Sequence, residues 1–113
     1  ATVTTLNLHF NKIGNAGAKD LAEVLLINAS VAQLDLGLNE ISDTGIKDLA
    51  EMLRVNATIT RLNLFGNEIS SIGKKALAEM LRINVTIITF DFGYNKYSSD
   101  DLQEEINRLS KIN

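Results

Sequence analysis

The sequence predicts an α/β repeat protein of four units, each containing a short strand, a loop and a helix. Three observations support this fold class. Many residue types recur with a 28-residue period, each unit has a short alternating apolar stretch, and apolar residues at helical spacing follow it. Units of this kind bury their apolar side chains against their neighbours, so we expect them to stack into a solenoid.

The 28-residue period holds at many positions along the chain. The clearest sets are Leu6, Leu34, Leu62 and Phe90; Asn11, Asn39, Asn67 and Asn95; Gly17, Gly45 and Gly73; and Leu25, Leu53, Leu81 and Leu109. Agreement at so many positions predicts a single domain over residues 1–113. Its repeats span about 3–30, 31–58, 59–86 and 87–113.

The first part of each unit predicts a strand with one buried face. In the second repeat, Leu34 and Leu36 alternate with polar residues, and Asn39 follows. The other repeats share this pattern, with Phe90 and Phe92 in the last one. Period-two alternation of this length is typical of a half-buried strand.

The second part of each unit predicts a helix. Leu21, Ala22 and Leu25 share one helical stripe, and the same set recurs at 49, 50, 53 and at 77, 78, 81. We expect N-caps at Asn15, Asp43, Ser71 and Ser99, whose side chains accept hydrogen bonds from free backbone N–H groups. We expect left-handed helix ends at Asn28, Asn56 and Asn84.

Charged side chains predict a solvated helix surface. Lys19, Lys47 and Lys75 each precede a Glu by four positions, at 23, 51 and 79. Residues at this spacing share a helix face, so we expect weak exposed ion pairs there.

The motif with Leu or another apolar residue at its first, fourth and sixth positions and Asn at its ninth resembles the leucine-rich repeat. The 28-residue unit with a full helix is similar to the ribonuclease-inhibitor-like subfamily, as in NOD-like receptors and Ran GTPase-activating proteins. This resemblance implies a right-handed solenoid with parallel strands on the concave side and helices on the convex side. The Asn column then has a structural role, bonding backbone groups of its own bend and of the next repeat.

The two ends of the predicted solenoid differ. The segment Ser99–Lys111 is rich in charge, as expected of a terminal repeat that seals the core. The N-terminal end starts directly in a strand and has no such cap, and uncovered edges invite pairing with other chains. The chain is therefore either a fragment of a longer solenoid or a homodimer through this N-terminal edge.

Composition excludes several function classes. The net charge of −3 gives no overall basic field, so we expect no nucleic-acid partner. The chain has no Cys and one His, which excludes thiolate catalysis, and we expect no metal and no cofactor. No apolar stretch approaches the roughly 18 residues of a membrane span, so we expect no membrane partner. Together with the absence of Cys and of a signal-peptide pattern at the N-terminus, this favours a cytoplasmic setting.

Short motifs with other associations are explained by the repeat. The patterns starting at Asn28, Asn56 and Asn84 match a glycosylation acceptor but recur with the 28-residue period. Gly66–Lys75 has the wrong spacing for a phosphate-binding loop. His9 has no accompanying Ser at a matching position, so we predict no catalytic residue.

The outward residues of the strands are the candidate binding surface, because packing does not dictate them. They combine polar groups with exposed aromatics, which protein interfaces favour. The predicted partner-binding residues are His9, Phe10, Gln33, Asp35, Leu38, Arg61, Asn63, Phe65, Asp91 and Tyr94. An alternative is that Phe65 only covers neighbouring glycines and nothing binds there.

The sequence thus favours a non-enzymatic protein–protein interaction module that binds a protein partner through its concave strand face. One alternative is a regulator of an enzyme, such as a GTPase-activating protein, although Arg61 has no mark of a catalytic role. Another alternative is a self-associating repeat fragment. Four strands give a footprint of only about 320 Å², so we expect weak binding by this segment alone.

Overall fold

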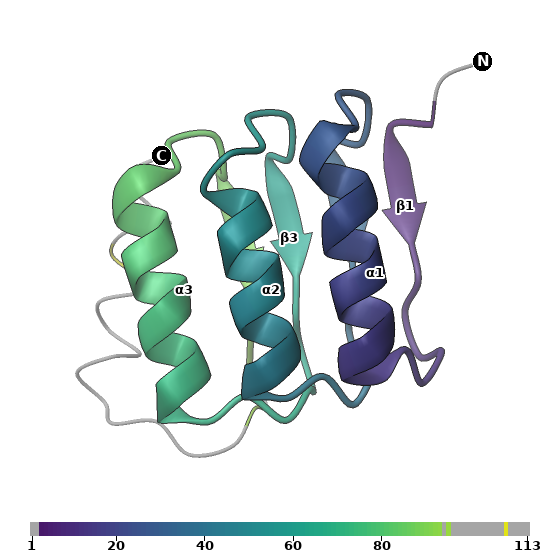
Figure 1. Cartoon of the computed structure of the whole chain (residues 1–113), viewed down its shortest axis with the longest axis vertical. Helices are drawn as coiled ribbons and strands as arrows, with labels where there is room; N and C mark the ends of the chain where they lie inside the picture. Colours follow the sequence, from purple (N-terminus) through teal and green to yellow (C-terminus); the bar gives the residue numbers. More distant parts are fainter. Residues whose placement is uncertain (1–2, 94, 96–107, 109–113) are drawn as a thin grey trace.

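The computed structural model describes residues 3–93, 95 and 108. Within these residues, four strands alternate with three helices (Figure 1). In chain order the elements are β1 (Thr5–Asn7), α1 (Gly14–Ile27), β2 (Gln33–Asp35), α2 (Asp43–Leu53), β3 (Arg61–Asn63), α3 (Ser71–Ile83) and β4 (Thr89–Asp91). The predicted helix start at Ser99 and the predicted C-terminal cap Ser99–Lys111 lie outside the described residues.

The strands form one parallel sheet in the order β1-β2-β3-β4. Leu6 pairs with Leu34, Leu34 with Leu62 and Leu62 with Phe90, so strand register follows the sequence period. The three helices stand side by side in a second layer in front of the sheet (Figure 1). The predicted α/β solenoid is confirmed. None of the described helices is both long and apolar enough to cross a membrane.

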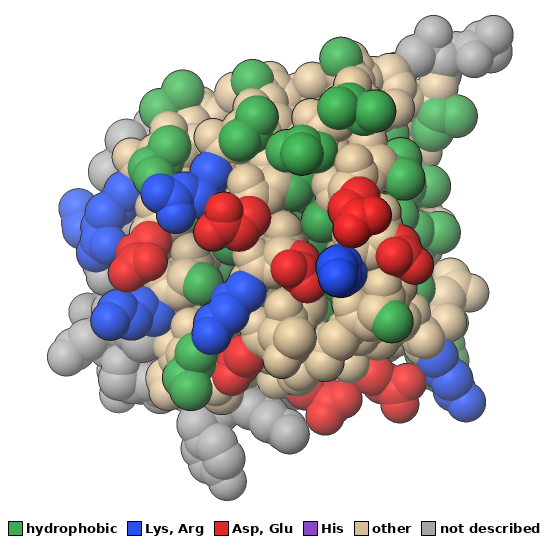
Figure 2. All heavy atoms as spheres, viewed as in Figure 1, with side chains coloured by type: hydrophobic (Ala, Val, Ile, Leu, Met, Phe, Trp, Pro, Cys, Tyr) green, Lys and Arg blue, Asp and Glu red, His purple; other side chains and the backbone are tan. Residues whose placement is uncertain are grey.

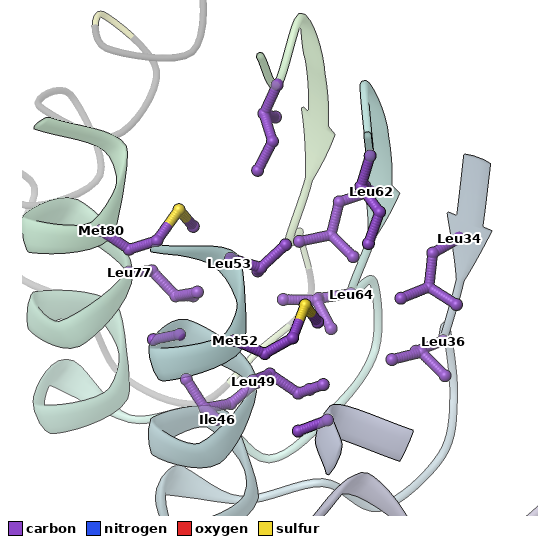
Figure 3. Close-up of a cluster of buried hydrophobic side chains, with 14 of the residues drawn as sticks. Leu34, Leu36, Ile46, Leu49, Met52, Leu53, Leu62, Leu64, Leu77 and Met80 are labelled. Carbon is purple, nitrogen blue, oxygen red and sulfur yellow. The ribbon is translucent and has the colours of Figure 1, made fainter. Parts of the chain in front are cut away.

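The core lies between the two layers. Inward residues of β2 and β3, such as Leu34 and Leu62, point toward Leu49 and Leu53 of α2 (Figure 3). All four side chains are buried. Because inward residues of the described strands and of α1, α2 and α3 belong to one cluster, the core is continuous along the described repeats.

The N-termini of the helices differ from the prediction. Helix α2 begins at Asp43 after Ser42, and α3 begins at Ser71 after Ser70. The residues predicted as N-caps therefore lie inside their helices, as Asn15 also does in α1. Of the three described helices, only α3 has a capping bond from its own N-cap residue, in which Ser70 accepts from the N–H of Ile72 at 3.3 Å.

Asn15 and Asp43 cap the helix of the following repeat instead. The Asn15 Oδ1 atom accepts from the N–H groups of Ser42 at 2.9 Å and Gly45 at 3.0 Å. Asp43 makes the same contacts with Ser70 and Gly73, at 2.9 and 3.1 Å. A Cβ on Gly45 would lie 2.6 Å from Asn15 Oδ1, so the recurring Gly makes room for this cap.

The helix ends also correct the prediction. Asn28 and Asn84 have extended backbones, with φ/ψ of −75°/131° and −74°/126°, so they are not left-handed. Asn56 and Asn84 instead bond helix carbonyls through their side-chain amides. Nδ2 of Asn56 donates to the Leu25 carbonyl at 2.9 Å, and Nδ2 of Asn84 donates to the Leu53 carbonyl at 2.8 Å. Each of these two amides thereby caps the helix of the preceding repeat.

The same Asn side chains explain the glycosylation-like patterns. Asn56 Oδ1 accepts from the N–H groups of Thr58 at 2.8 Å and Ile59 at 3.0 Å. Asn84 repeats this arrangement with Thr86 and Ile87. The pattern therefore follows from a recurring turn, and the amides of Asn56 and Asn84 are buried in the fold.

The column of Asn39 and Asn67 has the predicted structural role. Asn67 Oδ1 accepts from the N–H groups of Asn39 and Ile41, both at 3.0 Å, and its Nδ2 donates to the Leu36 carbonyl at 3.0 Å. These bonds reach the preceding repeat, whereas we expected the following one. Its Nδ2 also bonds the carbonyl of Leu64 in its own bend, at 2.9 Å.

Candidate protein-interaction surface

The strand face carries a shallow hollow of about 360 Å³. Every described strand contributes to it, because outward residues of the parallel strands align in rows. Its lining residues are Thr5, Asn7, Gln33, Leu34, Asp35, Arg61, Leu62, Asn63, Thr89 and Asp91. Five predicted partner-binding residues therefore meet in one place: Gln33, Asp35, Arg61, Asn63 and Asp91.

Gln33 and Arg61 form the centre of this hollow. They are paired in register on β2 and β3, and both side chains are exposed. Thr5 and Thr89 flank them on the outer strands and are also exposed. The row is available to a partner because the core does not use these side chains.

The next row has a structural role that the sequence prediction missed. Oδ1 of Asp35 accepts from the N–H of Gly37 at 2.9 Å. The same bond joins Asn63 to Phe65 at 2.8 Å and Asp91 to Gly93 at 3.0 Å. An Asn or Asp that bonds the backbone two residues ahead fixes a turn, which explains why this column is always amide or acid.

His9 and Phe65 lie over the glycines that follow β2 and β4. A Cβ on Gly37 would be 2.8 Å from His9 Nδ1, and one on Gly93 would be 3.5 Å from the Phe65 ring. His9 Nδ1 is 3.5 Å from Asp35 Oδ1. Phe65 is half-buried, so it both covers its neighbour and presents part of its ring to solvent.

Phe10 and Leu38 form an apolar ridge where the strands end. Phe10 is 73% exposed, and Leu38 leans onto Gly66. All three have left-handed φ angles, at 60°, 55° and 68°. Left-handed backbone is costly for bulky residues, so a tight bend is imposed here by the repeat. Tyr94, the fourth member of this column, lies outside the described residues.

The hollow is lined mainly by polar side chains. Within the described residues, no cluster of three or more His, Cys, Asp or Glu could hold a metal ion. His9 contacts a carboxylate, but no Ser or Cys lies among the residues that line the hollow. The amide, hydroxyl, carboxylate and guanidinium groups of the hollow can donate and accept hydrogen bonds.

The helix face holds features that the sequence prediction missed. Ile27, Val55 and Ile83 recur with the same period and are exposed. Figure 2 shows apolar side chains along this edge, over the C-terminal ends of the helices. The signal was present in the sequence as an apolar column outside the buried helical stripe.

One charged feature of the helices differs from the prediction, and a second was not predicted. Among the described residues, no ion pair joins Lys19, Lys47 or Lys75 to the Glu four positions ahead. Lys74 is buried, with Nζ 5.8 Å from the centre of the Phe92 ring. Burial lowers the pKa of this ammonium group.

Parallel strand–loop–helix units stacked in register, with a recurring Asn after the strand that bonds the backbone of the preceding repeat at Asn39, Asn67 and Asn95, define a leucine-rich-repeat solenoid. A family model described as Leucine Rich repeat matches residues 1–22, 28–50 and 55–78, so the chain belongs to the leucine-rich repeat family. No curated protein matches the chain.

Two solved structures illustrate how widely this fold is shared. One is "Leiomodin-1 Actin-Binding Site 2 (ABS2)", with TM-score 0.68 and 22% identity over 95% of this chain and 78% of that chain. The other is the tropomodulin C-terminal domain of Caenorhabditis elegans, with TM-score 0.64 and 11% identity over 96% of this chain and 83% of that chain. At these identities the likeness shows the fold alone.

Proposed function

We propose that this chain is a non-enzymatic protein–protein interaction module that binds a protein partner through its strand face. The observation that carries the proposal is the hollow formed by all four strands, with exposed Gln33 and Arg61 at its centre. Leucine-rich repeats are scaffolds whose solenoid presents an extended binding surface, which supports this use. The cytoplasmic setting expected from the sequence is part of the proposal.

Actin is the first partner to test. One of the two similar structures is a leiomodin segment named as an actin-binding site. Its 22% identity supports no transfer of residues, so the partner must be identified by direct binding. Titration of purified monomeric actin and co-sedimentation with filaments measure this directly.

The site itself is tested with paired variants against whichever partner binds. Phe65→Ala should weaken binding by more than about 1 kcal/mol, because aromatic anchors carry much of an interface's energy. Arg61→Ala should weaken it as well, since its guanidinium lies in the centre of the hollow. Lys47→Ala on the helix face is the control and should not. Unchanged affinity in both strand-face variants would place the interface elsewhere.

We also propose that the free edge of β1 pairs with a second copy of the chain. The supporting observation is that β1 contacts only β2 within the described sheet and that Val3 beside it is exposed. Strand edges with unpaired backbone groups are templates for pairing. This contact would lie on the open side of β1 and leave the centre of the strand face open.

A further inference from the structure

A groove of about 320 Å³ runs between α1 and α2 on the helix face. Its floor is apolar and its rim is charged. Among its lining residues are Glu23 and Leu26 from α1, with Asp48, Glu51, Met52 and Val55 from α2 and its end. Leu26 is 46% exposed and Val55 is 67% exposed, so the groove includes apolar side chains that the core does not cover.

The groove between α2 and α3 provides an internal comparison. It is lined by six of the eight equivalent repeat positions and encloses about 220 Å³. Two positions differ in chemistry. Arg54 stands where the first groove has Leu26, and Ala76 stands where it has Asp48. The first groove is therefore both more apolar and more acidic, and this difference is not required by the fold.

Charge on the helix face follows the same division, with acidic residues in excess on α1 and α2 and basic residues in excess on α3. Helices α1 and α2 together carry five acidic residues and two lysines, whereas α3 carries one Glu and, besides the buried Lys74, two basic residues. In Figure 2 the red acidic side chains gather over α1 and α2, while blue basic side chains dominate over α3. Among the described residues, Glu23, Asp48 and Glu51 form no salt bridge.

We propose that the α1–α2 groove is a docking site for a basic amphipathic helix of a protein partner. The partner helix places an apolar side chain against Leu26, Met52 and Val55. A Lys or Arg on the same helix then lies near Glu23 or Glu51. This surface is in the layer opposite the strand face, so it does not depend on the function proposed above.

The shape of the groove favours a helix as the occupant. From Lys19 to Leu26 the groove follows α1 for about 10 Å, which corresponds to two helical turns. Ridges of side chains on one helix fit grooves of this kind on others. The backbone groups of α1 and α2 are already bonded within the helices, so a partner strand would find no edge to extend. Anionic lipid is disfavoured because three of the four charged residues that line the groove are acidic, Lys19 being the exception.

The test uses a synthetic helical peptide of Leu and Lys, about 18 residues long so that it folds alone. A twin peptide carries Glu in place of Lys. Binding to the full chain is measured by fluorescence anisotropy, and the site is located by amide chemical shifts. We expect the Lys peptide to bind and to shift groove residues of α1 and α2, and the Glu peptide not to bind.

Two variants exploit the internal comparison. Leu26→Arg introduces the residue that the second groove has at this exposed position. It should lower the affinity for the Lys peptide by about tenfold or more. Arg54→Leu combined with Ala76→Asp should create a second site between α2 and α3. Thermal unfolding of each variant verifies that the fold is retained.

Several outcomes would overturn the proposal. Equal affinity of wild type and Leu26→Arg, or shifts confined to the strand face, would show that the peptide binds elsewhere. Self-association of the peptide-free chain that Leu26→Arg abolishes would assign the groove to a second copy. Equal affinity for the Lys and Glu peptides would show that the acidic rim does not select a basic partner.

Discussion

The first repeat and the interior repeats have the same apolar columns but very different burial. Val3 is 57% exposed, whereas Val31 at the equivalent position is 4% exposed. Val24 on α1 is 60% exposed, whereas Met52 on α2 is 2% exposed. Burial in this solenoid thus depends on the neighbouring repeat as well as on the repeat itself, as expected for quasi-one-dimensional stacking.

The polar contacts follow the same rule. Asn39 is buried, and its side chain bonds the backbone of the first repeat at Asn11, Ile13 and Leu8. The Asn11 side chain is exposed. Among the described residues, it bonds only the carbonyls of Leu8 and His9 in its own bend. The same residue type is therefore a link between repeats at Asn39 and a local turn residue in the first described repeat.

The largest expected difference concerns the strand core. Leu62→Ala should lower the free energy of unfolding by about 2–5 kcal/mol, because its side chain is buried between two neighbouring repeats. Leu6→Ala removes the same atoms from a half-buried position and should cost about 1 kcal/mol. Urea unfolding followed by circular dichroism measures both.

Arg61→Ala is the matched control for this pair, since Arg61 precedes Leu62 but points to solvent. Its cost should stay within about 0.5 kcal/mol. Comparable losses at Leu62 and Leu6 would contradict the idea that neighbours determine burial. A large loss at Arg61 would contradict the strand register.

The second prediction compares two members of one Asn column. Asn67→Ala leaves buried backbone groups of Asn39, Ile41 and Leu36 without their partner and should cost about 1–3 kcal/mol. Asn11→Ala should cost within about 0.5 kcal/mol, since Asn11 is exposed. Equal unfolding midpoints for the two variants would show that the amide links add no stability.

The fold was predictable because its main determinants are local and repeated. The alternation around Leu34 and Leu36 and the stripe of Leu49 and Leu53 indicate a strand and a helix without any knowledge of contacts. The repeat period then fixes the sheet register, which the structure confirms. Residue spacing alone was sufficient for both steps.

The caps were assigned wrongly because they act between repeats. Asn15 and Asp43 have the residue type of an N-cap, but their partners lie in the next helix. Likewise Asn56 was assigned to its own helix end, whereas its amide bonds the preceding helix. Residue type indicates that a bond is made, but position in a single repeat does not say with which repeat.

The candidate site was predictable as a surface but not residue by residue. Gln33 and Arg61 lie in the strand-face hollow as expected from outward spacing. Asp35 and Asn63 additionally bond their own turns, which composition alone did not show. The α1–α2 groove was missed because Leu26 looks like a core residue until the packing of the helices is known.

The third prediction concerns pH. It compares Asp43 with Asn15, since each of them caps the helix of the following repeat. Partial burial raises the pKa of Asp43, but hydrogen bonds from the Ser70 hydroxyl, the Ser70 N–H and the Gly73 N–H, together with Lys47, lower it by more. The folded pKa is thus below the ordinary value of about 3.9. The resulting stability is fully present above that value and is lost as pH falls through the lower folded pKa.

Asp43→Asn supplies the comparison, because Asn15 makes the equivalent contacts in the first interface without a charge. On acidification from pH 7 to about pH 3, the wild type should lose more stability than the variant. Urea midpoints at several pH values measure this difference. The other carboxylates are the same in both proteins, so their contribution to the pH dependence is removed by the comparison. Parallel curves for the two proteins would show that Asp43 is not linked to folding.

The smallest expected effect on stability is at the free edge of β1, in the incompletely covered first repeat. The Ala32 N–H of the second repeat donates to the Thr4 carbonyl at 2.7 Å, so the equivalent N–H of Thr4 faces the open side of β1. A two-fold axis perpendicular to the sheet would join two such edges antiparallel. Thr4→Pro removes this N–H and keeps the Thr4 carbonyl that bonds the second repeat, so it should abolish self-association at little cost in stability.

Sedimentation of the wild type and Thr4→Pro at increasing concentration measures this effect. The range should extend to about 1 mM, where a contact of about −4 kcal/mol is detectable. Lys47→Ala on the helix face is the control and should still associate. If the wild type is a monomer over this whole range, the exposed flank of the first repeat is not a homodimer interface.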